Sequence, residues 1–252
     1  MGIKLEVIAD SVTAAKAAEK GGADRIELCS GLLEGGITPS HGLIEQVREA
    51  VSIDLYVMVR PRGGDFLYSG DELDVMRKDI QVAQRLKADG IVLGVLDESG
   101  NIPREVVADL VKSARPLKVT FHRAFDYEKN PLESLESLCA LKVDRILTSG
   151  QRNSAFEGRE IIRKLIQKAG SRIIIMPGGG INESHIVEVI RETGATECHI
   201  SAKAIVESQM KYKSPTLSIG RDPGRDEYQR FSTDQGIVQK MRLILDQLSP
   251  DR

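Results

Sequence analysis

The sequence predicts one α/β domain, a TIM or (β/α)8 barrel spanning residues 1–252, from two observations. The first is length, because 252 residues match the roughly 250 of a typical barrel. The second is an internal repeat in which a helix-like segment ends, a small residue follows and an apolar strand begins. Its copies lie 52 to 65 residues apart, about twice the roughly 30 residues of a βα unit, so they mark every second strand. The copies are GADRIEL (22–28), KADGIVL (87–93), KVDRILT (142–148) and GATECHI (194–200).

The other elements fill the gaps in order, since the apolar period switches from 2 to 3.6 at each boundary. Asp10 or Ser11 can cap the first helix, Pro103 suits a first turn, and Asn182 opens the seventh helix. The expected strands are 3–9, 25–29, 55–60, 90–94, 117–123, 145–149, 172–177 and 197–201. The expected helices are 11–21, 40–50, 71–88, 103–114, 131–141, 157–169, 182–193 and 235–248. The stretch 207–234 is long and rich in Ser, Pro, Gly, Arg and Asp, which predicts a lid, a binding loop or a disordered segment.

Composition narrows the class of protein. A hydrophobic fraction of 41% and a net charge of −2 favour a packed globular domain. The near-neutral charge argues against a nucleic-acid binder, which would carry a basic domain or stripe. Three cysteines, an odd number, suggest reduced thiols, and no apolar run reaches 18 residues. We therefore expect a soluble, cytoplasmic protein with neither a membrane nor a nucleic acid as partner.

Alternation within the strands sends charged side chains into the barrel. If the aliphatic sets face the helices, the inward sets include Glu27 beside Arg25 and Cys29, and His199 beside Ser201. Buried charges are costly unless they are paired. Glu6, Glu27, Arg60 and His122 should therefore bond to one another or to a ligand. The alternative is an ion-pair network that only fills the barrel.

Candidate catalytic and anion-binding residues follow the third and fifth strands. The segment FHRAFD (121–126) carries His122, Arg123 and Asp126, residue types suited to proton transfer on an anionic substrate. With Glu27, His122 and Asp126 are the catalytic candidates. VRPRGGDFLY (59–68) places Arg60 and Arg62 around a turn that suits an anion, and with Arg123 they are candidate clamps. The alternative for these arginines is a solvated charge.

A second anion-binding signal follows the last two strands. MPGGGI (176–181) supplies Gly178, Gly179 and Gly180 before a helix expected at Asn182, and Ser201 and Lys203 leave the adjacent strand. Loops after the seventh and eighth strands, with a helix N-terminus, form the usual phosphate site of a TIM barrel. The alternative is that the glycines serve only a tight turn.

These motifs resemble the CutC family over essentially the whole chain. The matching segments are ELCSGLLEGGITPS (27–40), VRPRGGDF (59–66), FHRAFD (121–126), LTSG (147–150) and PGGGI (177–181). The resemblance implies a cytosolic TIM barrel named for copper homeostasis and a homodimer or larger homo-oligomer. It also implies Cu(I) binding by two thiols, at the ends of the first and second strands. The second aligns with Cys29, whereas the first aligns with Ile8, which cannot be a ligand.

Two functions therefore stay open. The resemblance implies copper homeostasis, with Cu(I) as ligand through Cys29. The residue chemistry favours an enzyme or binder for a small anionic or phosphorylated ligand at the C-terminal mouth of the barrel.

Overall fold

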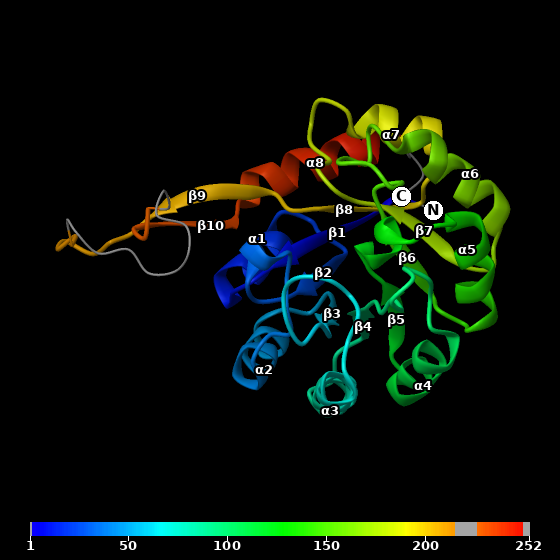
Figure 1. The fold of residues 1–252 in the computed structure, drawn as a ribbon. Coiled ribbons are helices and arrows are strands. Elements are labelled where there is room, and N and C mark those ends of the chain that lie inside the picture. The colour runs from blue at the N-terminus through cyan, green and yellow to red at the C-terminus, as the bar shows by residue number, and fades with distance from the viewer. Residues whose placement is uncertain (1, 215–225, 249–252) are drawn as a thin grey trace.

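The computed structural model describes residues 2–214 and 226–248, and it has the barrel that the sequence predicts (Figure 1). Eight parallel strands pair in the order β7-β6-β5-β4-β3-β2-β1-β8, and β7 and β8 lie against each other to complete the ring. The strands are β1 (Lys4–Ala9), β2 (Arg25–Leu28), β3 (Asp54–Met58), β4 (Gly90–Leu93), β5 (Lys118–Phe121), β6 (Arg145–Thr148), β7 (Ile174–Pro177) and β8 (Glu197–Ile200).

Helices alternate with these strands and cover the outside of the ring (Figure 1). Side-chain caps start several of them, as at Ser11, whose hydroxyl accepts a hydrogen bond from the Ala14 N–H. The apolar core lies between helices and strands, where Leu5, Ile26 and Leu55 are fully buried. The helices are α1 (Val12–Lys20), α2 (His41–Ala50), α3 (Gly70–Arg85), α4 (Arg104–Ala114), α5 (Pro131–Ala140), α6 (Arg159–Ala169), α7 (Ile186–Thr193) and α8 (Gln235–Leu248), with short 3-10 helices η1 (Leu32–Glu34) and η2 (Arg123–Tyr127).

The repeated aspartate of the sequence has a structural reason. In three copies of the repeat, the aspartate before an even-numbered strand accepts a backbone N–H of the preceding odd-numbered strand. This bond ties each βαβ unit together at the N-terminal end of the barrel. The pairs are Asp24 with Leu5 (2.8 Å), Asp89 with Leu55 (2.8 Å) and Asp144 with Val119 (2.9 Å).

Two expectations need correction. The seventh helix begins at Ile186 and not at 182, because the Asn182 carboxamide oxygen accepts the Ser184 N–H and hydroxyl in a turn that precedes it. The segment 207–234 is not simply a loop, since β9 (Lys203–Glu207) and β10 (Gln229–Thr233) form an antiparallel hairpin that projects from the barrel (Figure 1). Its remainder at 215–225 lies outside the described residues. None of the helices in the described ranges is long and apolar enough to cross a membrane.

Candidate functional site

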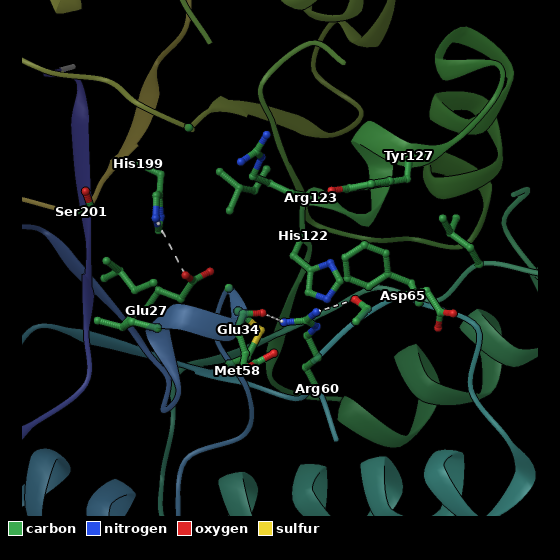
Figure 2. Close-up of a pocket in the computed structure, with 18 of the residues that line it drawn as sticks. Glu27, Glu34, Met58, Arg60, Asp65, His122, Arg123, Tyr127, His199 and Ser201 are labelled. Atoms are coloured by element: carbon green, nitrogen blue, oxygen red, sulfur yellow. Dashed lines mark hydrogen bonds and ion pairs between the residues drawn. The ribbon is translucent and has the colours of Figure 1, made fainter. Parts of the chain in front are cut away.

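A cavity of about 890 Å³ opens at the C-terminal ends of the strands (Figure 2). Its wall includes Glu27 from β2, Met58 from β3 and His199 from β8. Residues that follow β2, β3, β4, β5, β7 and β8 complete it. The cavity therefore lies where a TIM barrel places its functional residues.

A layer of paired charges lies inside the barrel. It comes from the fourth residue of the repeat, which is Arg25, Gly90, Arg145 or Glu197. Glu197 accepts from Arg25 at 2.5 Å and from Arg145 through two bonds at 2.6 and 3.0 Å. Gly90 leaves room for Tyr56, whose ring centroid lies 4.8 Å from the Arg25 guanidinium carbon. Alternate strands supply such layers in TIM barrels, although here the layer is ionic and not aliphatic.

Glu6 links this layer to His199. The Glu6 carboxylate accepts from Arg25 Nε and, at 2.8 Å, from His199 Nδ1. Burial opposes ionisation of Glu6, but the Arg25 charge and the His199 hydrogen bond hold the pKa of Glu6 well below its usual range. Glu6 is therefore a paired anion, which fits the network that the sequence offered as one alternative.

Glu27 is not satisfied in the same way. Its Oε2 lies 3.9 Å from His199 Nε2, and its Oε1 has no hydrogen-bond partner among the described residues, although the side chain is buried. Burial raises the pKa of Glu27 to about 7, with a smaller contribution in the same direction from the Glu6 charge, against the opposing charge of His199. Burial also lowers the pKa of His199, but Glu27 and the bond to Glu6 outweigh it and raise that pKa. Glu27 can thus hold or release a proton near neutrality.

His122 also lines the cavity and has a buried polar atom without a partner among the described residues. Its Nδ1 accepts the Ala124 N–H at 3.1 Å, so the neutral ring carries its proton on Nε2. Nε2 has no partner in the part of the chain that the structure describes. Burial, and then the Arg60 charge, lower the pKa of His122 to about 3. The ring is therefore a neutral N–H donor at physiological pH.

The two arginines after β3 have different places. Arg60 is buried on the cavity wall, but its guanidinium donates to the carbonyl oxygens of Glu34 (2.6 Å), Gly36 (2.8 Å) and Gly64 (2.8 Å). Its Nη atoms therefore hold two loops together, whereas its buried Nε has no hydrogen-bond partner among the described residues. Arg62 does not line the cavity, since it pairs with Glu72 at 2.6 Å and Asp65 at 3.1 Å.

Arg123 lines the cavity, and Asp126 orients it. Arg123 Nε donates to Asp126 at 2.8 Å, and its Nη2 donates to the Ser149 hydroxyl at 2.8 Å. Asp126 also accepts from the Thr148 hydroxyl at 2.5 Å and from the Ser149 N–H at 3.0 Å. With its oxygens so occupied and no place on the cavity wall, Asp126 has the geometry of a positioning residue.

The anion-binding candidates after β7 and β8 are partly brought together. Gly179, Gly180, Ser201 and Lys203 line the cavity. Gly179 has φ of +104°, and a Cβ there would lie 3.3 Å from the Arg123 guanidinium carbon, so glycine allows this close approach. Gly178 is not on the wall, because a Cβ there would meet Leu147 inside the barrel at 2.4 Å. The helix N-terminus expected at Asn182 is displaced to Ile186.

Sequence reasoning missed an acidic rim. Glu34, Asp65, Asp97 and Glu98 line the cavity from the loops after β2, β3 and β4, whereas Arg123 and Lys203 line it beyond β5 and β8. These carboxylates follow strand ends, which is the signal that could have found them. The mouth is thus divided into an acidic side and a basic side.

The candidate copper ligand Cys29 lies behind this wall. It is fully buried, and a Cβ on Gly36 would lie 3.3 Å from its Sγ. Ile8 packs against the cluster that holds Cys29, so an aliphatic side chain occupies the place where the family resemblance implies the first thiol. Burial, and then the Glu27 charge, raise the pKa of Cys29 above its ordinary value. The cluster offers one buried, protonated thiol and the Met58 thioether, so it fits a Cu(I) site made of two thiolates poorly.

A different group has metal-ligand spacing in the described part of the chain. Donor atoms of Glu6, Glu27 and His199 lie within 4.8 Å of one another. Two carboxylates and an imidazole suit harder ions than Cu(I). Glu6 and His199 already bond to each other, and Arg25 binds the same carboxylate. We therefore assign Glu6 and His199 to the ion-pair network, while Glu27 lies beside it without a close hydrogen bond.

Comparison with known proteins identifies the family. The sequence model of the CutC family matches residues 3–204. The chain belongs to the CutC family. CutC relatives from Mus musculus and Homo sapiens, named copper homeostasis protein cutC homologs, are each 47% identical over 243 residues, covering 96% of this chain and 89% of theirs. The family resemblance and its link to copper homeostasis, predicted from the sequence, are thereby confirmed.

Solved structures confirm the fold. The crystal structure of a CutC protein from Streptococcus agalactiae superposes with a TM-score of 0.75 and 35% identity, covering 78% of this chain and 97% of that one. A thiamine phosphate pyrophosphorylase from Pyrococcus furiosus gives a TM-score of 0.61 over 98% of this chain and 97% of its own. At 18% identity, that likeness shows the barrel alone.

Proposed function

We propose that this CutC protein is an enzyme that binds a small anionic ligand in the cavity and moves a proton on it with Glu27. One observation carries the proposal: Glu27 and His122 each bury a polar atom that has no partner among the described residues, and both side chains line the same cavity. Leaving such atoms unpaired costs roughly 1–3 kcal/mol each, a cost that a ligand could offset. The ions below them, by contrast, pair with one another inside the barrel.

The anion would lie on the basic side of the mouth. Arg123 is fixed by Asp126 and Ser149 beside Gly179, and Lys203 and Ser201 line the same cavity. Arg60 adds a buried positive charge near His122. These groups support an anion more than the acidic side does, so we expect the neutral or hydroxyl-rich part of the ligand to face Glu34, Asp65 and the other rim carboxylates.

Copper stays a candidate ligand through the family name, with Cys29 as its one soft thiol. The buried, protonated thiol and Ile8 beside it favour weak Cu(I) binding, if any. A cytoplasmic location and a homodimeric or larger assembly remain expectations from the family resemblance. Exposed Ile205, Met210 and Tyr212 in the segment that carries β9 are consistent with such an assembly.

The test of anion binding is a phosphate titration followed by thermal unfolding. A ligand that binds only the folded state adds RT ln(1 + [L]/Kd), about 2.7 kcal/mol at 100 times Kd. Phosphate should therefore raise the Tm to a plateau, while chloride should not. Lys203→Gln should shift the titration to higher phosphate, whereas Lys4→Gln, which removes an exposed lysine at the opposite end of β1, should leave it unchanged. Equal responses in both variants would place the anion elsewhere.

A further inference from the structure

We propose that the substrate carries a carbonyl group, which the Nε2–H of His122 polarises while Glu27 removes a proton from the adjacent carbon. The substrate class is an enolisable hydroxyketone or hydroxyaldehyde with a phosphate or carboxylate at its other end. This inference rests on the proposed acid–base function and adds the functional group on which that function acts.

The carbonyl assignment starts from the fixed tautomer of His122. The Ala124 N–H is bound to Nδ1, so Nε2 must present a hydrogen, and a hydrogen-bond acceptor is the group that satisfies it. The ring has little freedom to turn away. A Cβ on Gly94 would lie 2.4 Å from ring atoms of His122, and the Phe66 ring packs with its centroid 5.0 Å from the imidazole. The protein thus holds one N–H donor ready at a fixed place on the wall.

The neutral state of His122 selects the kind of acceptor. With its pKa near 3, His122 does not gain a proton at physiological pH, so it is a poor general acid and a poor partner for a full phosphate charge. A fixed neutral N–H is suited to an oxygen on which charge develops during reaction, as on a carbonyl that becomes an enolate. Arg60, buried next to it, adds a positive field to the same place.

Glu27 supplies the complementary group. Figure 2 has Glu27 with His199 on one side of the cavity and His122 with Arg123 on the other, so a ligand between them meets both. The carboxylate of Glu27, whose Oε1 has no partner among the described residues, is the group that takes the proton. His199, bonded to Glu6, lies 3.9 Å from the other oxygen and can stabilise the carboxylate. A buried carboxylate without ordered donors is a strong base toward carbon.

The step balances without a co-reactant. The C–H bond next to the carbonyl breaks, and its proton goes to Glu27 Oε1. The bonding pair becomes the C=C bond of an enolate, and the carbonyl π pair moves to the oxygen held by His122 Nε2–H. Return of the proton from Glu27 restores a carbonyl compound. Nothing is oxidised or reduced by an outside reagent, so the minimal observable reaction is exchange of that hydrogen with solvent.

The test measures deuterium uptake from D₂O into two probes, dihydroxyacetone phosphate and hydroxypyruvate, by proton NMR. The protein should accelerate exchange at the hydroxymethyl carbon of at least one probe by 100-fold or more over buffer. The phosphate and carboxylate probes distinguish the two kinds of anionic end. Exchange of neither probe above the buffer rate would overturn the assignment, and a saturable phosphate effect on Tm would then leave the anion site itself standing.

Paired variants distinguish the effect of losing the His122 N–H donor from the effect of altered packing around that side chain. His122→Gln can place an amide N–H near the position of Nε2, and we expect it to keep exchange within about 10-fold. His122→Asn can keep an acceptor for Ala124 but is too short to present that donor, so exchange should fall by roughly 10²–10³, the usual loss for one oxyanion donor. With Glu27→Gln, hydrogen exchange of the probe should fall to the rate in buffer alone. With Lys4→Gln, it should match the rate with the unaltered protein. Equal exchange in His122→Asn and the unaltered protein would overturn the role of His122.

A measurement on the unaltered protein tests the role of His122 even if its variants do not fold. Nitrogen-15 NMR of labelled histidine should give His122 as the neutral Nε2–H tautomer from pH 5 to 8. Protonation of His122 within that range, or a proton on Nδ1, would refute the neutral-donor assignment.

Discussion

Replacing Glu27 with glutamine should stabilise the protein, and increasingly so as the pH rises. The ordinary pKa of a glutamate is 4.5, and burial raises that of Glu27 to about 7. In this window the unfolded chain has released a proton that the folded chain still holds, so stability falls as pH rises from 4.5 to 7 and then levels off. At about 1.4 kcal/mol per pKa unit, the loss reaches roughly 3 kcal/mol above pH 7. Glutamine does not titrate, so Glu27→Gln escapes this loss.

The assay is urea unfolding of both proteins at half-unit steps from pH 5 to 8.5. The difference in free energy of unfolding should be small at pH 5 and approach 3 kcal/mol in favour of Glu27→Gln at pH 8. Glu27 also raises the pKa of His199, and the stabilisation of the unaltered protein that results is present at low pH and lost as pH rises through that raised value, so this second effect has the same sign as the first.

Glu197→Gln is the matched control for this experiment. Burial opposes ionisation of Glu197, but Arg145 and Arg25 outweigh it and lower its pKa, so its charge stabilises the fold above the ordinary glutamate value and that stability is lost as pH falls. Glu197→Gln should therefore destabilise at neutral pH, by several kcal/mol if removing a buried partner has its usual cost. If Glu27→Gln were less stable than the unaltered protein at pH 8, or if the difference did not vary with pH, Glu27 would not be an unsatisfied buried carboxylate.

Two further predictions concern the cavity and copper. Gly94→Ala should displace the His122 imidazole, because its Cβ would lie 2.4 Å from ring atoms. Calorimetry should show that the free energy of unfolding falls by about 1–3 kcal/mol, as is usual for overpacking. Histidine NMR should show shifted signals for His122, and unshifted signals would contradict a ring held in a fixed place. Against a Cu(I) chelator, the unaltered protein should compete weakly, while Ile8→Cys should compete much better because it adds a thiol next to Cys29. Tight stoichiometric binding that Cys29→Ala abolishes would show that one thiol is enough.

The fold was predictable because its signal is repeated. Three copies of the repeat place an aspartate where a neighbouring strand needs an acceptor, so the same local solution appears at Asp24, Asp89 and Asp144. The inward direction of Glu6 and Glu27 followed from strand alternation and is confirmed by their burial. The repeat could also have revealed Arg145 and Glu197, which occupy the same position as Arg25. Reading each copy separately concealed that alignment.

What could not be predicted depends on turns and side-chain partners. The start of α7 depends on a turn in which the Asn182 side chain accepts hydrogen bonds from Ser184. Such a turn competes locally with the helix, and the apolar periodicity of the sequence does not predict it. The hairpin of β9 and β10 is short and half exposed, so it carries little apolar pattern. Asp126 and Arg62 had the right residue types near the mouth. Only coordinates show that their polar atoms bond to Arg123 and Glu72, respectively.

The charges inside this barrel differ by depth, and that difference is the strongest argument for a ligand. Glu6 and Glu197 neutralise Arg25 and Arg145 through short bonds below the cavity, where the barrel needs only to be filled. At the cavity, Glu27 and His122 each keep a buried polar atom with no partner in the part of the chain that the structure describes. A structural network could have paired these two as it paired the others. Since burial without pairing costs free energy, a fold that keeps both groups unpaired and facing one space is best explained by a molecule that completes them there.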